Sequence, residues 1–389
     1  MIHSRYLYPF ILNDALSAHK MAFLSGPRQV GKTHLAKCCL KNSSNYFNWD
    51  DVDFKKSWVK SPSATLENMA AGPVVFDEIH KYKKWKTTLK GLYDRIGKEV
   101  PMIVTGSAKL DLYKRGGDSL LGRYLPYRLN PFTVAERNKN FPVPNEWQSH
   151  PCNFSIGDLL NLSGFPEPLL GGSQKKAKRW SRLRLEQIIR GDVRDFKNIY
   201  DLELISLLAH LLPERVGSPL SMNGLVEDVG VTYATLREWL AVLESVYVCF
   251  KVKPYHRNIS RALKKEAKYY LYDWTEITSA GARLENLVAV HLLKICQFWT
   301  DTAEGVFDLY YLRTKEKAEV DFLITSDQKP WLLVECKSNE TSISPALKKF
   351  ADFFKNVTAF QLTTANVDKK IPGSNIHLIN TEKFLTMLI

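Results

Sequence analysis

Residues 21–33 read MAFLSGPRQVGKT, and this stretch decides the fold of the first part of the chain. The apolar run 21–24 predicts a buried strand, and the apolar spacing over 35–40 predicts a helix. Between them, the pattern G-x-x-x-x-G-K-T over 26–33 has the spacing of a loop whose backbone N–H groups surround a phosphate. The sequence therefore predicts a phosphate-binding loop in a strand–loop–helix setting.

The residue types of this loop indicate a nucleoside triphosphate with its metal. The glycines let the backbone curl around an anion, and the following helix adds partial positive charge at its first turn. Lys32 would reach the β- and γ-phosphates, and Thr33 would hold Mg²⁺. The expected ligands are therefore ATP and Mg²⁺. The residues expected to bind the nucleotide are Gly26, Pro27, Arg28, Gln29, Val30, Gly31, Lys32, Thr33 and His34.

A second motif, PVVFDE at 73–78, places two acids directly after a short apolar run. Such a run predicts a buried parallel strand, and ligands of open α/β sheets bind at the carboxyl ends of the strands. Asp77 would hold the Mg²⁺ shell, and Glu78 could orient or deprotonate the attacking water. Further strands of the same sheet are expected over 46–49, 100–107 and 124–129.

Composition limits the remaining choices. The 389 residues require more than one domain, and the net charge of +13 suits a polyanion such as DNA, or a basic surface kept for solubility. Six cysteines without a C-x-x-C pair disfavour a zinc ribbon and predict reduced thiols. The N-terminus lacks a signal-peptide pattern, and no apolar run is long enough to span a membrane. These features predict a cytoplasmic protein with no membrane partner.

The motifs GPRQVGKT, VVFDE, VTGSAKL and GRY…LNPFTVAE together resemble the AAA+ ATPases. The resemblance covers nearly the whole chain and is closest to a prokaryotic group in which a domain of unknown function with a nuclease-like end follows the ATPase domain. It implies that Ser107 is the sensor-1 residue and that Arg123 is an arginine finger acting on a neighbouring subunit, hence a homo-oligomer. An ion pair under the sheet is an equal alternative for Arg123.

The middle of the chain combines basic and apolar residues. A basic amphipathic helix is expected over 174–190, facing either DNA or solvent. Arg190 and Arg194 are the two candidates for a sensor-2 contact to ATP. Residues 221–246 have a helix–glycine turn–helix pattern, and two strands after them would form a wing. The basic set of this wing, expected on DNA phosphates, is Lys251, Lys253, His256, Arg257, Arg261, Lys264, Lys265 and Lys268. A winged helix used only for packing or protein contacts is the alternative.

The last part of the chain carries a pattern of acids and a lysine on neighbouring strands. Asp321 and Glu335 could hold Mg²⁺ with the Cys336 carbonyl, while Lys337 steadies the attacking water. With Glu285 on the preceding helix, these residues resemble the PD-(D/E)XK nuclease superfamily. A structural ion pair between the carboxylates and Lys337 is the alternative.

The sequence thus predicts an α/β protein in four parts. These are a P-loop AAA+ domain over 1–140, a small helical lid over 141–200, a winged-helix domain over 201–275 and a restriction-endonuclease-like domain over 276–389. The leading functional hypothesis is an oligomeric ATPase that binds DNA and remodels, translocates on or senses it. The alternatives are an ATP-gated, Mg²⁺-dependent DNA endonuclease and a nucleotide-switched scaffold without a DNA role.

Overall fold

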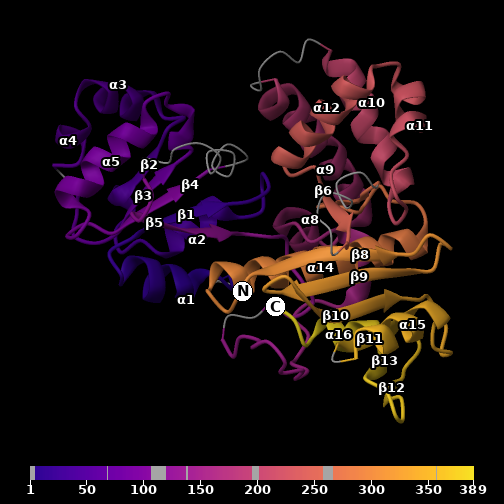
Figure 1. Cartoon of the computed structure of the whole chain (residues 1–389). Helices are drawn as coiled ribbons and strands as arrows, with labels where there is room; N and C mark the ends of the chain where they lie inside the picture. Colours follow the sequence, from indigo (N-terminus) through magenta and orange to yellow (C-terminus); the bar gives the residue numbers. More distant parts are fainter. Residues whose placement is uncertain are drawn as a thin grey trace. The chain divides into compact units, whose positions relative to one another are not determined.

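The structure is a computed structural model that describes residues 5–67, 69–106, 120–136, 139–194, 201–256, 266–355 and 357–389. The chain forms two units, one built mainly from residues up to 130 and the other from 131–136 and 141–389 (Figure 1). Several positions singled out from the sequence lie outside the described residues. They are Ser107, Arg257, Arg261, Lys264 and Lys265.

A five-stranded parallel sheet forms the centre of the first unit. Its order is β2-β3-β4-β1-β5, and each neighbouring pair is parallel, as for Asp77 of β3 opposite Thr105 of β4. The strands are β1 (Met21–Ser25), β2 (Tyr46–Asn48), β3 (Val74–Asp77), β4 (Met102–Thr105) and β5 (Tyr124–Arg128). All five lie where the apolar runs predict them, and their carboxyl ends share one edge.

Helices cover the faces of this sheet. They are α1 (Tyr8–Phe10), α2 (Lys32–Cys38), α3 (Val52–Lys60), α4 (Pro62–Thr65) and α5 (Trp85–Ile96). Phe54 and Trp58 of α3 and Leu89 of α5 are buried in one core cluster with Phe76 and Val104 of the sheet. Burial of such large side chains is worth about 1.5–3 kcal/mol each, so this cluster fixes the sheet that carries the predicted loop.

The second unit contains an eight-stranded mixed sheet of order β12-β13-β11-β10-β9-β8-β6-β7. The strands are β6 (Cys249–Pro254), β7 (Lys268–Leu271), β8 (Phe307–Arg313), β9 (Glu319–Ser326), β10 (Lys329–Cys336), β11 (Thr358–Thr363), β12 (Asp368–Lys370) and β13 (Ile376–Asn380). The two strands predicted as a wing, β6 and β7, are thus the end of this sheet. They join it because Lys253 and Pro254 pair in parallel with Tyr310 and Tyr311.

The helices of the second unit are α7 (Ile156–Leu162), α8 (Pro166–Gly171), α9 (Gln174–Gln187), α10 (Leu202–Leu211), α11 (Met222–Val229), α12 (Tyr233–Ser245), α14 (Ala280–Asp301), α15 (Pro345–Phe353) and α16 (Thr381–Leu385). Helix α14 lies along the sheet near β8 and β9 (Figure 1), while Leu347 of α15 packs on Leu323 and Leu333. Within the described ranges, no helix combines the length and the apolar character of a membrane span.

The helices of the predicted lid belong to the second unit. The Trp274 indole N–H donates to the Leu159 carbonyl of α7 at 2.7 Å, and the Ser181 hydroxyl of α9 donates to Asp273 at 2.7 Å. Both contacts attach lid helices to the chain just after β7. The lid and the region predicted as a winged helix therefore share hydrogen bonds within one unit.

The segment that follows β5 is anchored in the second unit by a buried ion pair. Lys294 of α14 contacts Glu136 at 2.6 Å, both side chains are fully buried, and the same ammonium donates to the Thr133 hydroxyl at 2.8 Å. His291 accepts a backbone N–H of the segment through Nε2 at 3.0 Å. Burial lowers the pKa of His291 to about 3, so the ring is neutral and Nδ1 donates to the Leu287 carbonyl.

Removing one partner of this pair should destabilise the second unit. Lys294→Met leaves the Glu136 carboxylate buried without its cation, and breaking a buried pair in this way costs about 3–5 kcal/mol. We expect a loss of that size in the free energy of unfolding, measured by urea titration with tryptophan fluorescence. The control Lys383→Met removes the partly exposed pair with Asp368 and should cost less than about 1 kcal/mol. Equal losses in both variants would contradict the anchor.

Candidate functional site

The loop after β1 has the backbone that the glycine pattern predicts. Gly26 adopts φ 145° and Gly31 φ 102°, and a Cβ placed on Gly26 would lie 2.2 Å from the Leu129 carbonyl oxygen. Gly26 is therefore required both by its left-handed backbone and by the close approach of the chain after β5. Gln29 also has a positive φ of 65°, which turns the chain back toward α2.

Arg5, which the sequence analysis did not assign, stabilises this loop through hydrogen bonds. Its guanidinium is buried and donates to the Val30 carbonyl at 2.9 Å and to the Asn130 carbonyl at 2.6 Å. One side chain thus joins the loop to the second residue after β5. No local motif signals this role, because the two carbonyls are 25 and 125 positions away in the sequence.

Lys32 lies under the loop with its ammonium directed at the loop carbonyls. Its Nζ donates to the Gly26 carbonyl at 2.9 Å and to the Pro27 carbonyl at 2.7 Å, and the residue is only 7% exposed. A fixed, partly desolvated ammonium beside curled backbone is a suitable cation for phosphate oxygens.

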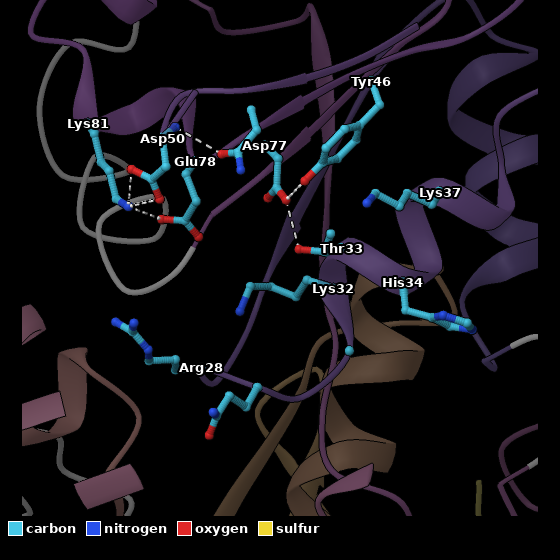
Figure 2. Close-up of a pocket in the computed structure, with 13 residues that line it drawn as sticks. Arg28, Lys32, Thr33, His34, Lys37, Tyr46, Asp50, Asp77, Glu78 and Lys81 are labelled. Carbon is cyan, nitrogen blue, oxygen red and sulfur yellow. Dashed lines mark hydrogen bonds and ion pairs between the residues drawn. The ribbon is translucent and has the colours of Figure 1, made fainter. Parts of the chain in front are cut away.

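The Asp77 carboxylate at the end of β3 is held by hydroxyl groups from three other elements. Thr33 of α2 donates to Oδ2 at 2.8 Å, Tyr46 of β2 donates to Oδ2 at 2.6 Å, and Thr105 of β4 donates to Oδ1. Figure 2 shows Asp77 between Tyr46 and Thr33. The adjacent Thr33 hydroxyl and Asp77 carboxylate are hard oxygen donors, so this pair fits Mg²⁺.

Tyr46 is a second residue that the sequence analysis did not find. Burial, with the hydrogen bond to Asp77, raises the pKa of its phenol, so the group stays a donor. The Lys37 ammonium lies 4.0 Å from the centre of its ring, within cation–π range. One feature could have indicated Tyr46: β2 and β3 pair as parallel neighbours, and parallel neighbours have their carboxyl ends at the same edge of the sheet.

Glu78 is held beside Asp77 in a left-handed backbone conformation with φ 57°. Its Oε2 lies 3.5 Å from the Lys81 Nζ and 3.7 Å from the His80 Nε2. Lys81 also contacts Asp50 at 2.6 Å, as Figure 2 shows. Although burial opposes it, these two carboxylates raise the pKa of Lys81, which keeps its positive charge beside Glu78.

These residues surround a cavity of about 650 Å³, a volume typical of small-molecule sites. Its lining includes most of the residues predicted from the two motifs. It also includes Lys37, Tyr46, Asn48, Asp50 and Lys81, which the sequence analysis did not assign. The lining residues are Arg28, Gln29, Gly31, Lys32, Thr33, His34, Lys37, Tyr46, Asn48, Asp50, Asp77, Glu78 and Lys81.

Arg123 pairs within its own unit. Its Nε lies 2.7 Å from Asp94 Oδ1 of α5. The hydrogen bond raises the pKa of Arg123 and lowers that of Asp94. The ion-pair alternative is therefore present, and the finger stays a prediction. The sensor-2 candidates Arg190 and Arg194 line another cavity of about 630 Å³, with His210.

The four predicted nuclease-like residues come close to one another in the second unit. Asp321 of β9 donates its backbone N–H to Glu335 Oε2 at 3.3 Å, and Glu335 Oε1 lies 3.0 Å from Lys337 Nζ. Glu285 joins them through Lys268, whose ammonium lies 3.3 Å from Glu285 and 3.4 Å from Asp321. Burial and the charge of Asp321 raise the pKa values of Glu285 and Glu335 to about 7.

Lys268 corrects one expectation from the sequence. It was predicted to lie on DNA phosphates with the basic wing, but its side chain is fully buried among carboxylates. Burial alone would lower its pKa, and the charges of Glu285, Asp321 and Glu319 outweigh that effect and raise it. Lys251 and Lys253 of β6 are exposed, as expected.

Helices α11 and α12 lie where the sequence predicts the two helices of a helix-turn-helix, and the winged helix itself stays a prediction. Gly230 ends α11 in a left-handed conformation, and the Thr232 hydroxyl accepts the Thr235 backbone N–H at 3.2 Å as the cap of α12. Arg237 is exposed near the start of α12, and Tyr233 is 53% exposed. Helix α9 exposes Lys175, Lys176, Lys178, Arg179 and Arg182.

Comparisons with known proteins identify a domain family for the first part of the chain. Residues 18–138 match the family model of an AAA domain, and residues 154–275 and 280–384 match two domains of unknown function, DUF8612 and DUF4143. The chain therefore carries an AAA-type P-loop domain at its N-terminal end. The two further models meet near the end of the region predicted as a winged helix, and neither describes a nuclease.

Relatives extend over most of the chain. An uncharacterized protein of Mycobacterium tuberculosis is 22% identical over 349 residues, which cover 87% of this chain and 75% of the relative. One of Methanocaldococcus jannaschii is 24% identical over 388 residues, covering 92% and 82%. Among solved structures, the Thermotoga maritima RuvB Holliday junction branch migration motor matches with a TM-score of 0.32 and 18% identity, over 67% of this chain and 94% of that one.

The close approach at Gly26 gives a direct test of the site. Gly26→Ala places a methyl group against the Leu129 carbonyl, so the loop must shift, and we expect the affinity for a fluorescent ATP analogue to fall more than about tenfold. The control is Gly91→Ala in α5, where an added Cβ has no neighbour within 4 Å, and it should leave affinity unchanged. Full affinity in the Gly26 variant would show that the nucleotide does not use this loop.

Proposed function

We propose that this protein binds and hydrolyses ATP in the cavity between the loop 26–33 and the end of β3. The observation that carries the proposal is the Thr33–Asp77 hydrogen bond of 2.8 Å beside the buried Lys32 ammonium. The match of residues 18–138 to an AAA domain supports it. The cavity offers cations for phosphates and hard oxygen donors for a metal at the same place.

Each residue of the cavity would have a separate role in hydrolysis. Lys32 would exchange the loop carbonyls for the β- and γ-phosphate oxygens, and Arg28 would add positive charge at the same end. Mg²⁺ held by Thr33 and Asp77 would neutralise charge on the phosphates. Glu78 would take a proton from the attacking water once Lys81 turns toward Asp50 alone. Ser107 stays a proposed sensor of the γ-phosphate.

We further propose that DNA is the partner and that the active form is a homo-oligomer. The exposed basic residues of α9 and the exposed start of α12 supply phosphate contacts and a helix that could enter a groove. ATP hydrolysis would then drive the protein to remodel, translocate on or sense DNA. Arg123 would act on the ATP of a neighbouring subunit after leaving Asp94.

A nucleotide-switched scaffold without a DNA role is the competing function. It would use the same ATP cavity, and its exposed lysines would serve solubility. The two functions differ in the response to salt, because binding through phosphate contacts weakens steeply as salt rises.

Loss of the loop lysine should abolish turnover. Lys32→Ala removes the cation that contacts the phosphates, so we expect kcat for ATP hydrolysis to fall by about 10²-fold or more. Phosphate release measures this effect. Lys56→Ala on α3, whose side chain is 76% exposed, is the control and should hydrolyse ATP normally. Unchanged hydrolysis after Lys32→Ala would reject the ATPase proposal.

Charge removal on α9 should weaken DNA binding in a salt-dependent way. For the double variant Lys175→Gln/Arg179→Gln, we expect the slope of log affinity against log salt to become shallower by about two. Fluorescence anisotropy with duplex DNA measures it. The control Lys348→Gln/Lys349→Gln removes two exposed charges from α15 and should leave the slope unchanged. DNA that neither binds nor stimulates ATP hydrolysis would favour the scaffold.

A further inference from the structure

One buried ammonium group lies at the centre of the C-terminal carboxylate cluster. Lys268 of β7 has a fully buried side chain, and its Nζ lies 2.7 Å from Glu319 Oε1. The same nitrogen lies 3.3 Å from Glu285 Oε1 and 3.4 Å from Asp321 Oδ1. Acids from α14 and β9 thus converge on a cation that the chain itself provides.

The carboxylate oxygens of the predicted metal ligands already have partners. Asp321 uses Oδ1 for Lys268, and its Oδ2 accepts the Cys336 backbone N–H at 2.9 Å. Glu335 uses Oε1 for Lys337 at 3.0 Å, and its Oε2 accepts the Asp321 backbone N–H at 3.3 Å. Each of these two carboxylates thus already contacts an ammonium group of the chain, unlike Asp77, whose oxygens accept neutral hydroxyl groups.

The acids around this pair are also neutralised or hydrogen-bonded. Glu285 Oε1 accepts the Tyr270 phenol at 2.6 Å in addition to Lys268. Glu319 contacts Arg313 at 3.3 Å through its second oxygen. Among the described residues, no group of three or more histidine, cysteine, aspartate or glutamate side chains is arranged to hold a metal ion. The residues therefore do not fit the metal that a PD-(D/E)XK resemblance implies.

We propose that the Lys268 ammonium is the resident cation of this cluster, taking the place that a divalent metal would need. The ammonium and a divalent metal would have to occupy the same position among the same acids. A metal beside a buried ammonium would meet strong like-charge repulsion, because the site is shielded from water. The carboxylates then serve to hold β7 against β9 and α14. The cluster is an internal ion-pair network, and metal-assisted phosphodiester hydrolysis does not occur there.

The test measures metal uptake directly, with no dependence on ATP hydrolysis or cleavage. The full chain carries Asp77→Asn, which removes the carboxylate proposed for the metal of the ATP cavity. Mn²⁺ is titrated in, and electron paramagnetic resonance reports the free ion. In this background Lys268→Met, which keeps the side-chain length and removes the charge, should create a saturable Mn²⁺ site. Lys268→Arg should not. The control Lys251→Met removes a lysine of β6 that pairs with Glu244 of α12, and it should not create a site either.

Each outcome decides for or against the resident lysine. The parent chain should show no saturable Mn²⁺ uptake. Uptake by the parent that disappears with Asp321→Asn would overturn the proposal, and so would a Lys268→Met protein, folded by circular dichroism, that takes up no Mn²⁺. If Lys268→Met does not fold, Lys268→Gln, which also removes the charge, is titrated in its place, and the same two outcomes decide. A failure here leaves the ATPase proposal untouched, since the two sites share no residue.

Discussion

The Asp77 carboxylate ties four elements of the first unit to one point. Its oxygens accept hydroxyl groups from α2, β2 and β4, while Asp77 itself ends β3. This convergence exists because β2, β3 and β4 are parallel neighbours whose carboxyl ends meet at one edge. Thr33 can join only if the loop before α2 follows the tight path that Gly26 and Gly31 allow. A shift of any one element would therefore displace Lys32, the Thr33–Asp77 pair and Glu78 together.

The short segments after β5 are each held by contacts within their own unit. Leu129 approaches Gly26, and Asn130 accepts Arg5, which also holds the loop at Val30. The following segment is fixed by the Lys294–Glu136 pair. Burial of a charged pair is costly without good geometry, which the contact of 2.6 Å provides.

Sequence motifs predicted the loop and the strand end that each lie within one short stretch of the chain. The glycine spacing of 26–33 and the apolar run before Asp77 describe single loops and strands, and the carboxyl-end rule brings them together. Tyr46 and Lys81 could not be assigned this way, because their roles follow from strand order and from contacts across the sheet edge. Arg5 lies in a lead-in segment with no motif. Lys268 was misplaced because a lysine in a basic run is normally solvated, and only the acids of distant strands make its burial favourable.

Charge balance explains why a buried lysine suits the C-terminal cluster. Four carboxylates, from Glu285, Glu319, Asp321 and Glu335, lie near three cations, from Lys268, Arg313 and Lys337. Without compensation, four largely buried acids in one place would repel one another, so a cation must be present whatever its source. A metal can dissociate, and its binding depends on supply. A lysine on β7 is fixed by the chain, so folding of the sheet and neutralisation of the acids become one event.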